Sequence, residues 1–167
     1  MLAADGSDVT IRFNQSNAEV IYNDGMLSCR LIEGKYPNYN SVIPQDNPNR
    51  LTIDRKALIS ALRRVMPFAS ESTQLVKLRI ANNSLEINSE DIEFATSARE
   101  NVVCEYGGMP MSSGLKGSAL YAVGDSLTSD EIVIERADPG RAGIISPAQQ
   151  PEGEDVLMLI MPMLLND

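Results

Sequence analysis

Histidine is absent from the 167-residue sequence, and cysteine occurs only twice. Without histidine, Ser-His-Asp and Cys-His nucleophilic sites are excluded, and the commonest zinc ligand is missing. Cys29 and Cys104 have no metal-ligand spacing, and each lies in a stretch of alternating apolar residues. We therefore expect two buried, reduced thiols and a cytosolic, cytoplasmic protein.

Long hydrophobic runs are also missing. The longest, residues 156–165, is far shorter than the roughly 20 residues that span a bilayer. No basic segment followed by an apolar one indicates a secretory signal. An apolar content of 43% and a charged content of 22% are ordinary for a globular protein of about one domain, or one and a fraction.

Positive charge is scarce, because 14 basic residues face 23 acidic ones and the net charge is −9. This balance argues against a protein that coats nucleic acid through its bulk charge. A local basic patch can still be hidden in such an average, so the distribution of charge along the chain matters.

The first part of the chain predicts strands and no helix. Residues 9–13, 18–22 and 26–32 alternate between apolar and polar side chains, and Asn23-Asp24-Gly25 is typical of a tight turn. Residues 33–49 contain three prolines and lack periodicity, which indicates a linker or domain junction.

The remainder predicts the order strand, helix, strands twice. The first round has a strand at 51–53 and a helix that Asp54 caps and that ends near Met66, followed by strands at 75–80, 84–88, 92–98 and 102–106. The second has strands at 111–115, 131–135, 143–146 and 156–161, with a helix at 116–127 that Gly117 and Gly124 weaken. This order predicts a pseudo-duplicated α+β fold with antiparallel sheets and two helices on one face.

The first helix carries a candidate binding face. With its apolar stripe toward the sheet, Lys56, Ser60, Arg63 and Arg64 face outward, and no acid lies among them; Arg55 lies nearer the apolar side. Ala57, Ser60 and Ala61 have small side chains, and we expect them to keep this face of the helix from protruding. Such a face fits a polyanion that is contacted without base recognition, or it is an ordinary solvated helix face.

Six acids form a further group along the chain that only Arg99 interrupts: Glu86, Glu90, Asp91, Glu93, Glu100 and Glu105. A hard-metal site, an ionic partner surface and a solvated edge are all compatible with them. Strand spacing spreads the carboxylates over both faces of a sheet, which suits a metal poorly.

The end of the chain is apolar on both strand faces, and three of the eight methionines lie in its last ten residues. Methionine-rich surfaces adapt to varied peptides, whereas a central strand buried on both faces would give the same pattern. Pro162 cannot donate to a ladder, so we expect pairing to weaken there.

Several segments together resemble one family. Residues 29–39 (CRLIEGKYPNY) resemble the end of the middle domain of bacterial sliding clamps, the β subunits of DNA polymerase III. Residues 51–67, 75–80 and 138–145 and the terminal Met161-Pro162-Met163 resemble the third domain of these proteins. The resemblance implies a DNA-clamp fold, with residues 1–48 as the last strands of the middle domain plus a linker and residues 49–167 as the third domain.

The resemblance also implies a function. Clamps of this family are rings of two head-to-tail subunits that encircle double-stranded DNA, without sequence preference, and confer processivity on the polymerase. They have no catalytic site and no cofactor. The implied partners are DNA, the DNA polymerase III catalytic subunit, the clamp loader, other proteins with a clamp-binding motif, and a second subunit of the homodimer ring.

Three sets of residues acquire roles from this resemblance. A DNA-channel set comprises Lys56, Arg63, Arg64 and Lys116. A peptide-groove set comprises Pro37, Val42, Leu159, Ile160, Met161, Pro162 and Met163. A subunit-interface set comprises Phe68, Ala69, Glu90, Asp91 and Glu93.

Two other classes of protein stay open. The chain could be a small acidic protein-interaction domain that uses its methionine-rich edge and does not contact DNA. An enzyme would need a carboxylate pair or a metal cluster, and no spacing in the sequence supports one.

Overall fold

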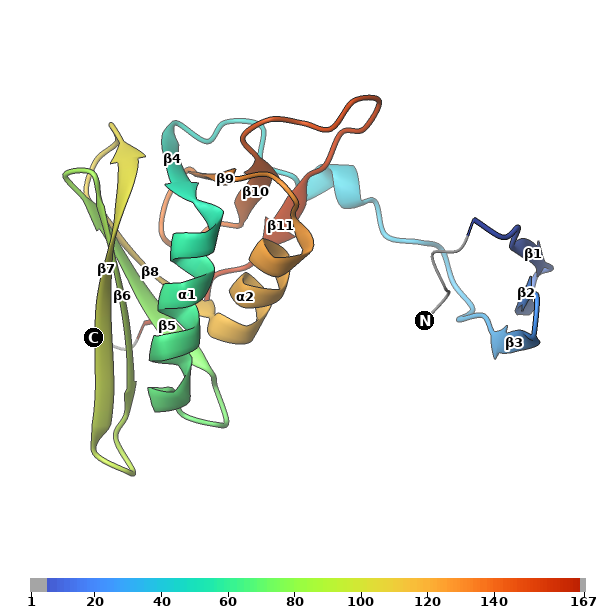
Figure 1. Ribbon diagram of the computed structural model, residues 1–167, viewed down its shortest axis with the longest axis horizontal. Coiled ribbons are helices and arrows are strands. Elements are labelled where there is room, and N and C mark those ends of the chain that lie inside the picture. Colours follow the sequence, from blue (N-terminus) through green and yellow to red (C-terminus); the bar gives the residue numbers. More distant parts are fainter. Residues whose placement is uncertain (1–5, 166–167) are drawn as a thin grey trace. The chain divides into compact units, whose positions relative to one another are not determined.

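The computed structural model describes residues 6–165, and the chain divides into two units, Met1–Asn38 and Tyr39–Asp167. Each unit is described by itself below. Figure 1 labels the helices and strands of both.

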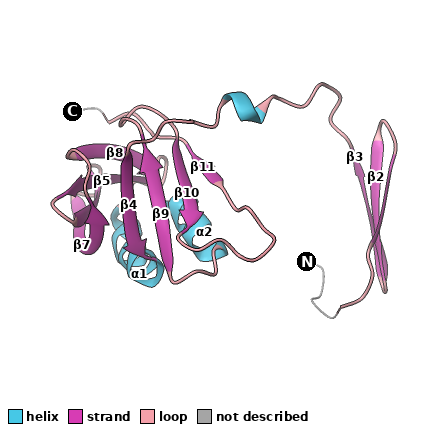
Figure 2. Cartoon of the chain, turned by 90° about the horizontal axis from the view of Figure 1, so that it is seen from above, coloured by secondary structure: helices cyan, strands magenta, loops and turns pink. Residues whose placement is uncertain are grey.

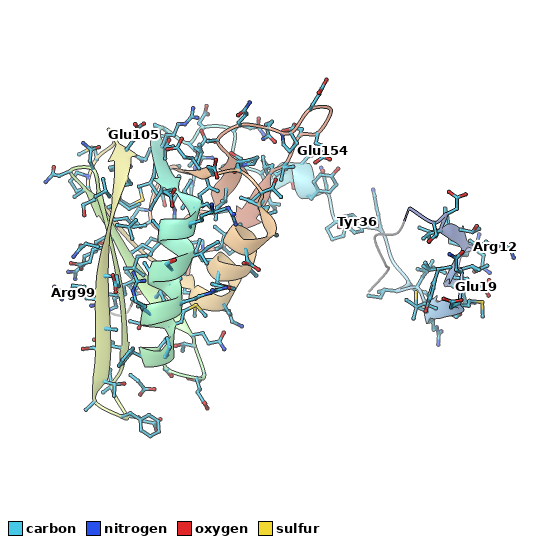
Figure 3. All side chains as sticks on the ribbon, viewed as in Figure 1. Arg12, Glu19, Tyr36, Arg99, Glu105 and Glu154 are labelled. Carbon is cyan, nitrogen blue, oxygen red and sulfur yellow. The ribbon has the colours of Figure 1, made fainter. Side chains whose placement is uncertain are left out.

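The first unit is a three-stranded antiparallel sheet of strands β1 (Thr10–Phe13), β2 (Asn17–Tyr22) and β3 (Gly25–Arg30), in that order. Arg12 and Glu19, labelled in Figure 3, stand opposite each other on β1 and β2. The three predicted strands and the turn before Gly25 are confirmed. The third strand ends two residues earlier than predicted, at Arg30.

The side chains of this sheet are largely exposed. Phe13 is 78% exposed and Met26 60% exposed, because within the described residues of this unit no helix or second sheet packs on the three strands. The prediction of a buried thiol is therefore wrong for Cys29, which is exposed on β3; Cys104 of the second unit is buried, as predicted.

The second unit begins with a short 3₁₀ helix, η1 (Tyr39–Ser41), and then repeats one order of elements twice. The first repeat consists of β4 (Asn49–Asp54), α1 (Arg55–Val65), η2 (Met66–Phe68), β5 (Leu75–Ala81), β6 (Ser84–Asp91) and β7 (Thr96–Tyr106). The second consists of β8 (Met111–Lys116), α2 (Gly117–Ser126), β9 (Glu131–Arg136), β10 (Gly143–Pro147) and β11 (Met158–Ile160). The predicted strand-helix-strands order is confirmed in both repeats.

Strand pairing reflects the same duplication. The strands form one antiparallel series in the order β11-β10-β9-β4-β7-β6-β5-β8. Strand β4 of the first repeat pairs with β9 of the second and with β7 of its own repeat. Strand β8 correspondingly pairs with β5 of the other repeat, and its Gly114 forms a bridge to Met163, just beyond β11. Each repeat thus begins with a strand that joins the two halves.

One predicted strand is wrong. Residues 92–95 form a turn, and a single strand β7 takes the place of the strands predicted at 92–98 and 102–106. Asp91 makes the turn, because its Oδ1 accepts hydrogen bonds from the backbone N–H of Glu93 (2.9 Å) and of Phe94 (3.3 Å). Ile92 and Phe94 supply the apolar alternation that predicted a strand, yet both side chains are exposed.

Helices α1 and α2 lie side by side and cover one face of the strands, as predicted (Figures 1 and 2). The buried stripe of α1, which includes Leu58, Leu62 and Val65, joins Leu120 of α2 in one hydrophobic core with the strands. The two glycines of α2 allow close packing. A Cβ on Gly117 would lie 3.1 Å from Met66 Cγ, and one on Gly124 would lie 3.4 Å from Ile59 Cγ1.

Candidate functional site

The outward face of α1 is the first candidate. Asp54 Oδ1 accepts a hydrogen bond from the backbone N–H of Ala57 (2.7 Å), so the predicted N-cap starts the helix. Lys56, Ser60, Arg63 and Arg64 are exposed, as predicted. The expectation that Ala61 belongs to this face is wrong: it is fully buried, because it lies beside Leu58 and Leu62 on the core stripe.

Arg63 is held by the neighbouring helix. Its Nε donates to the hydroxyl of Tyr121 on α2 at 2.9 Å, and its Nη2 donates to the same oxygen. The guanidinium carbon also lies 5.3 Å from the centroid of the Tyr121 ring. The hydrogen bond to Tyr121 raises the pKa of Arg63 above its ordinary value. Tyr121 orders the Arg63 side chain without neutralising its charge. The residue pattern along α1 does not predict this contact, because Tyr121 belongs to α2.

Arg64 has an acidic partner. Its Nε lies 2.7 Å from Glu100 Oε1 and its Nη2 3.2 Å from Oε2, a two-pronged ion pair between α1 and β7. The bond from Arg64 lowers the pKa of Glu100. The sequence correctly shows no acid on α1 itself, but the inferred absence of an acid from this face is wrong, because β7 brings Glu100 to it.

The other cations near the helices differ in their surroundings. Arg55 donates through Nε to the Ser129 carbonyl (2.8 Å) and through Nη1 to the Gly124 carbonyl (3.4 Å), so it ties α1 to α2 and to the loop after α2. Lys56 and Lys116 are exposed, and neither has an ion pair within residues 6–165. Helix α2 contains no basic residue and one acid, Asp125.

The acidic group is divided among several environments. Glu90 pairs with Lys77 (3.2 Å), and Glu86 lies 3.6 Å from Arg79 and 3.7 Å from Arg99. Asp91 is 8% exposed and serves as the acceptor of the turn described above. In the part of the chain that the structure describes, no three acids, cysteines or histidines are grouped as metal ligands.

Phe68 and Ala69 lie just after α1, at η2, where Ala69 N–H donates to the Met66 carbonyl (3.0 Å). Phe68 is half-exposed. A depression beside β5 is lined by Leu75 and Lys77 together with Glu90, Asp91 and Glu93. Three of the five subunit-interface residues therefore border one depression, whereas Phe68 and Ala69 are not among its lining residues.

The C-terminal segment is a further candidate site. Strand β11 is an edge strand that pairs with β10. This position favours a methionine-rich surface over a central strand buried on both faces. Its ladder ends at Ile160, two residues before Pro162, as predicted. The sequence does not predict the contact made by the next residue: the Met163 N–H donates to the Gly114 carbonyl (2.9 Å), so the segment crosses to β8.

The predicted peptide-groove residues differ in exposure. Met161 is 64% exposed and Val42 56% exposed, whereas Ile160 belongs to the hydrophobic core. Leu159, Pro162 and Met163 are half-buried, and Pro37 is exposed in the first unit. Pro162 and Met163 also line a cavity of about 460 Å³, together with Lys77 and Arg79 of β5, Ser112 to Gly114 of β8, Pro139, Gly140, Leu164 and Leu165.

A buried arginine was not predicted. Arg136, at the end of β9, is 3% exposed and has no carboxylate within ion-pair distance among the described residues. Its Nη1 donates to Ser113 Oγ (2.6 Å), and its Nη2 donates to the carbonyls of Pro139 and Arg141 (both 3.1 Å). Burial lowers its pKa. Arg136 lies two residues after Ile134 and four after Ile132, so it shares their strand face. This alternation was the one sequence feature that could have predicted its burial.

The second unit is a duplicated α+β domain with both helices on one face of antiparallel strands (Figure 1) and three cations exposed on the outward face of α1. The chain matches the family described as "DNA polymerase III beta subunit, C-terminal domain" over residues 40–164. The chain belongs to this family. The beta sliding clamp is a non-catalytic processivity factor of DNA replication, so the prediction that the chain is not an enzyme is confirmed by its family.

The relatives are beta sliding clamps that are longer than this chain. The beta sliding clamp of Caulobacter vibrioides (strain NA1000 / CB15N) is 25% identical over 158 residues, which are 95% of this chain and 42% of that protein. That of Synechococcus elongatus is 27% identical over 169 residues, 99% of this chain and 44% of that protein. The chain therefore spans less than half the length of these curated relatives.

Solved clamps share the fold. A sliding clamp from Pseudomonas aeruginosa has a TM-score of 0.84 at 23% identity and covers 97% of this chain with 43% of its own. A clamp from Bartonella birtlesii bound to griselimycin has a TM-score of 0.84 at 24% identity, covering 94% of this chain and 41% of that one. Within residues 6–165, no helix is both long and apolar enough to cross a membrane.

Proposed function

We propose that this chain is part of a sliding clamp that encircles double-stranded DNA and confers processivity on the replicative polymerase in the bacterial cytoplasm. The observation that carries the proposal is the family match over residues 40–164. Residues 49–167 would be the third clamp domain, and residues 1–48 would be the last strands of the middle domain and a linker. The exposed three-stranded sheet of the first unit supports this division, because such a sheet needs further elements to bury its apolar side chains.

The helix layer would face the DNA. Lys56, Arg63, Arg64 and Lys116 would form the channel surface. They are exposed on or beside the helices, whereas the grouped acids lie on β6, β7 and their turn; Glu100 of β7 is the exception to this separation, because it pairs with Arg64. This partial separation would help to reconcile a net charge of −9 with a partner that is a polyanion. Because the ring would hold DNA topologically, a few weak phosphate contacts suffice.

A groove at the C-terminal segment would bind short peptides of the polymerase catalytic subunit, the clamp loader and other proteins with a clamp-binding motif. Within the second unit its lining would be Val42, Leu159, Ile160, Met161, Pro162 and Met163, with Ile160 supporting the others from the core. The exposure of Met161 and Val42 supports this role, since both are apolar side chains available for contact.

The subunit interface of a homodimeric ring would include Phe68, Ala69, Glu90, Asp91 and Glu93. Half-exposed Phe68 would supply apolar contact, and the exposed carboxylates of Glu90 and Glu93 would pair with basic residues of the second subunit. Asp91 would act by holding the turn that presents Glu93.

The direct test is binding of a fluorescent peptide that carries the clamp-binding tail of the polymerase, monitored by anisotropy. Met161→Ala removes an exposed groove side chain and should weaken binding about tenfold, as expected when a well-buried contact of about 1–2 kcal/mol is lost. Met109→Ala is the matched control, because Met109 is also exposed (79%) but lies in the loop before β8, outside the proposed groove. Equal affinities for both variants would count against the groove.

A small acidic interaction domain that never contacts DNA is the second candidate, and the net charge of −9 favours it. Binding to a short DNA duplex at varied salt concentration distinguishes the two functions. A clamp segment should bind a short duplex weakly at low salt and lose the complex as salt is raised. An acidic interaction domain should not bind the duplex at any salt concentration.

A further inference from the structure

The two neighbouring arginines on the outward face of α1 have chemically different partners. We propose that Arg63 is the phosphate-contacting arginine of α1, that Tyr121 positions it, and that Glu100 cancels the charge of Arg64 and so limits the affinity of this face for DNA. This inference rests on the proposed DNA-encircling function and assigns separate roles within the DNA-channel set.

Arg63 retains its charge and part of its donor capacity. Arginine has five N–H donors, and here Nε and Nη2 converge on the single hydroxyl oxygen of Tyr121. The Nη1 group has no partner among the described residues. Because the phenol is neutral and the side chain is exposed, the full positive charge faces outward with its long side chain already ordered. Asp125, one turn beyond Tyr121 on α2, is the nearby acid, and it forms no ion pair with Arg63 in residues 6–165.

Arg64 is held in an ion pair with Glu100. Both carboxylate oxygens of Glu100 are engaged, at 2.7 and 3.2 Å, in the fork geometry that makes Arg–carboxylate pairs strong. A phosphate that approached Arg64 would have to displace Glu100 and would also meet its negative charge. The Glu100 side chain is 30% exposed, so its charge is felt at the surface.

Tyr121 acts through Arg63 and is therefore a positioning residue. It belongs to α2, and the glycine-mediated packing of α2 on α1 brings it within reach. A phenylalanine at this position would keep the ring under the guanidinium but remove the acceptor. Arg63 would then sample more rotamers before it met a phosphate.

The test is a titration of the ¹⁵N-labelled chain with a short DNA duplex at several salt concentrations, in which the Nε–H signals of Arg63 and Arg64 are monitored by NMR. Arg63→Ala should lower the slope of log K against log salt by about 0.9, the value for one phosphate contact, and Arg64→Ala should leave it nearly unchanged. Glu100→Gln should raise the slope by about 0.9 and make the Arg64 signal respond to DNA, because it frees one cation. Tyr121→Phe should weaken binding about threefold with the slope unchanged, the size expected for lost ordering of one long side chain.

Arg79→Ala is the matched control, because Arg79 is an exposed arginine (62%) paired with a glutamate on a strand. Thermal unfolding of each variant separates lost binding from lost structure. Equal losses from Arg63→Ala and Arg64→Ala, or no gain from Glu100→Gln, would overturn this inference while leaving a DNA-binding clamp. Absence of binding by every variant, Glu100→Gln included, would contradict the proposed function itself.

Discussion

The backbone N–H of Met163 donates to the carbonyl of Gly114 at 2.9 Å, and this bond joins the end of the second repeat to its first strand. The first repeat makes the corresponding connection through the pairing of β4 with β7. The C-terminal segment is thus an integral element of the duplicated domain. Its Met161 is presented at the surface by a segment anchored on both sides, at Ile160 and at Met163.

Gly114→Ala should loosen this anchor. A Cβ at this position would lie 2.9 Å from the backbone carbonyl oxygen of Met163 and 2.8 Å from Leu165 Cδ2, so the segment would have to move. We expect a loss of about 1–3 kcal/mol of unfolding free energy, typical of overpacking. Urea unfolding and faster hydrogen exchange of the Met163 amide provide the measurements. Gly107→Ala is the control, since its Cβ would meet no atom within 4 Å, and equal effects of the two substitutions would contradict the explanation.

The two glycines of α2 should respond differently to substitution by alanine. Gly124→Ala should stabilise the domain by about 0.5–1 kcal/mol, because alanine favours the helix and its Cβ would make an ordinary contact 3.4 Å from Ile59 Cγ1. Gly117→Ala should give no gain, because its Cβ would lie 3.0 Å from Val76 Cγ1 and 3.3 Å from the Gln74 carbonyl oxygen. Thermal unfolding of both variants checks this order. A larger gain from Gly117→Ala would show that Val76, Met66 and Gln74 move aside more easily than their packing indicates.

Arg136 allows a test of how a buried charge is held. Arg136→Lys keeps the charge but cannot reach Ser113, Pro139 and Arg141 together, so we expect a loss of about 2–4 kcal/mol. Arg136→Met removes the charge and its burial cost along with the hydrogen bonds, and should cost about 1–2 kcal/mol. Urea unfolding at neutral pH measures both. If lysine were tolerated better than methionine, water would have to reach this position.

The ion pair of Glu100 with Arg64 predicts a dependence of stability on pH. The pair lowers the pKa of Glu100 in the folded state, so the unfolded state binds a proton at a higher pH than the folded state does. The stabilisation is present above the ordinary carboxyl pKa and disappears as the pH falls through the lowered one. Glu100→Gln should therefore flatten this part of the acid limb of the stability profile, measured as the urea midpoint against pH.

Glu152→Gln is the control for that profile, because Glu152 is exposed in the loop between β10 and β11 and has no ion pair among residues 6–165. It makes the same change in net charge without removing the pair. An acid limb that changes equally in both variants would assign the effect to overall charge.

The elements of the fold could be predicted where the signals are local. The strands predicted at 75–80 and 84–88 are present as β5 and β6, and Asn82 and Asn83 between them both have the positive φ that a tight hairpin turn requires. The alternation of Ile92 and Phe94 misled the prediction, because apolar pattern measures side-chain type and Asp91 decides the backbone there through two hydrogen bonds. Periodicity alone does not say that an apolar residue will be exposed at a turn.

The candidate site was predictable only in part for a similar reason. Helical spacing correctly places Lys56, Arg63 and Arg64 outward. Their partners come from other elements: Glu100 is 36 residues from Arg64 and Tyr121 is 58 residues from Arg63. Whether an arginine on a helix is free or neutralised depends on such tertiary neighbours, and no pattern within α1 reports them.

The one-bond anchor of the C-terminal segment also has a mechanical consequence. Strand β4 lies between two neighbours, β7 and β9, whereas β11 has three residues and pairs with β10 alone. A force applied beyond residue 165 would therefore first break the bond at Met163 and then peel β11 away, one pair at a time. An unfoldase that pulled on this segment would meet less resistance than one that pulled on β4. We therefore expect the C-terminal segment to detach first when the domain is unfolded by force.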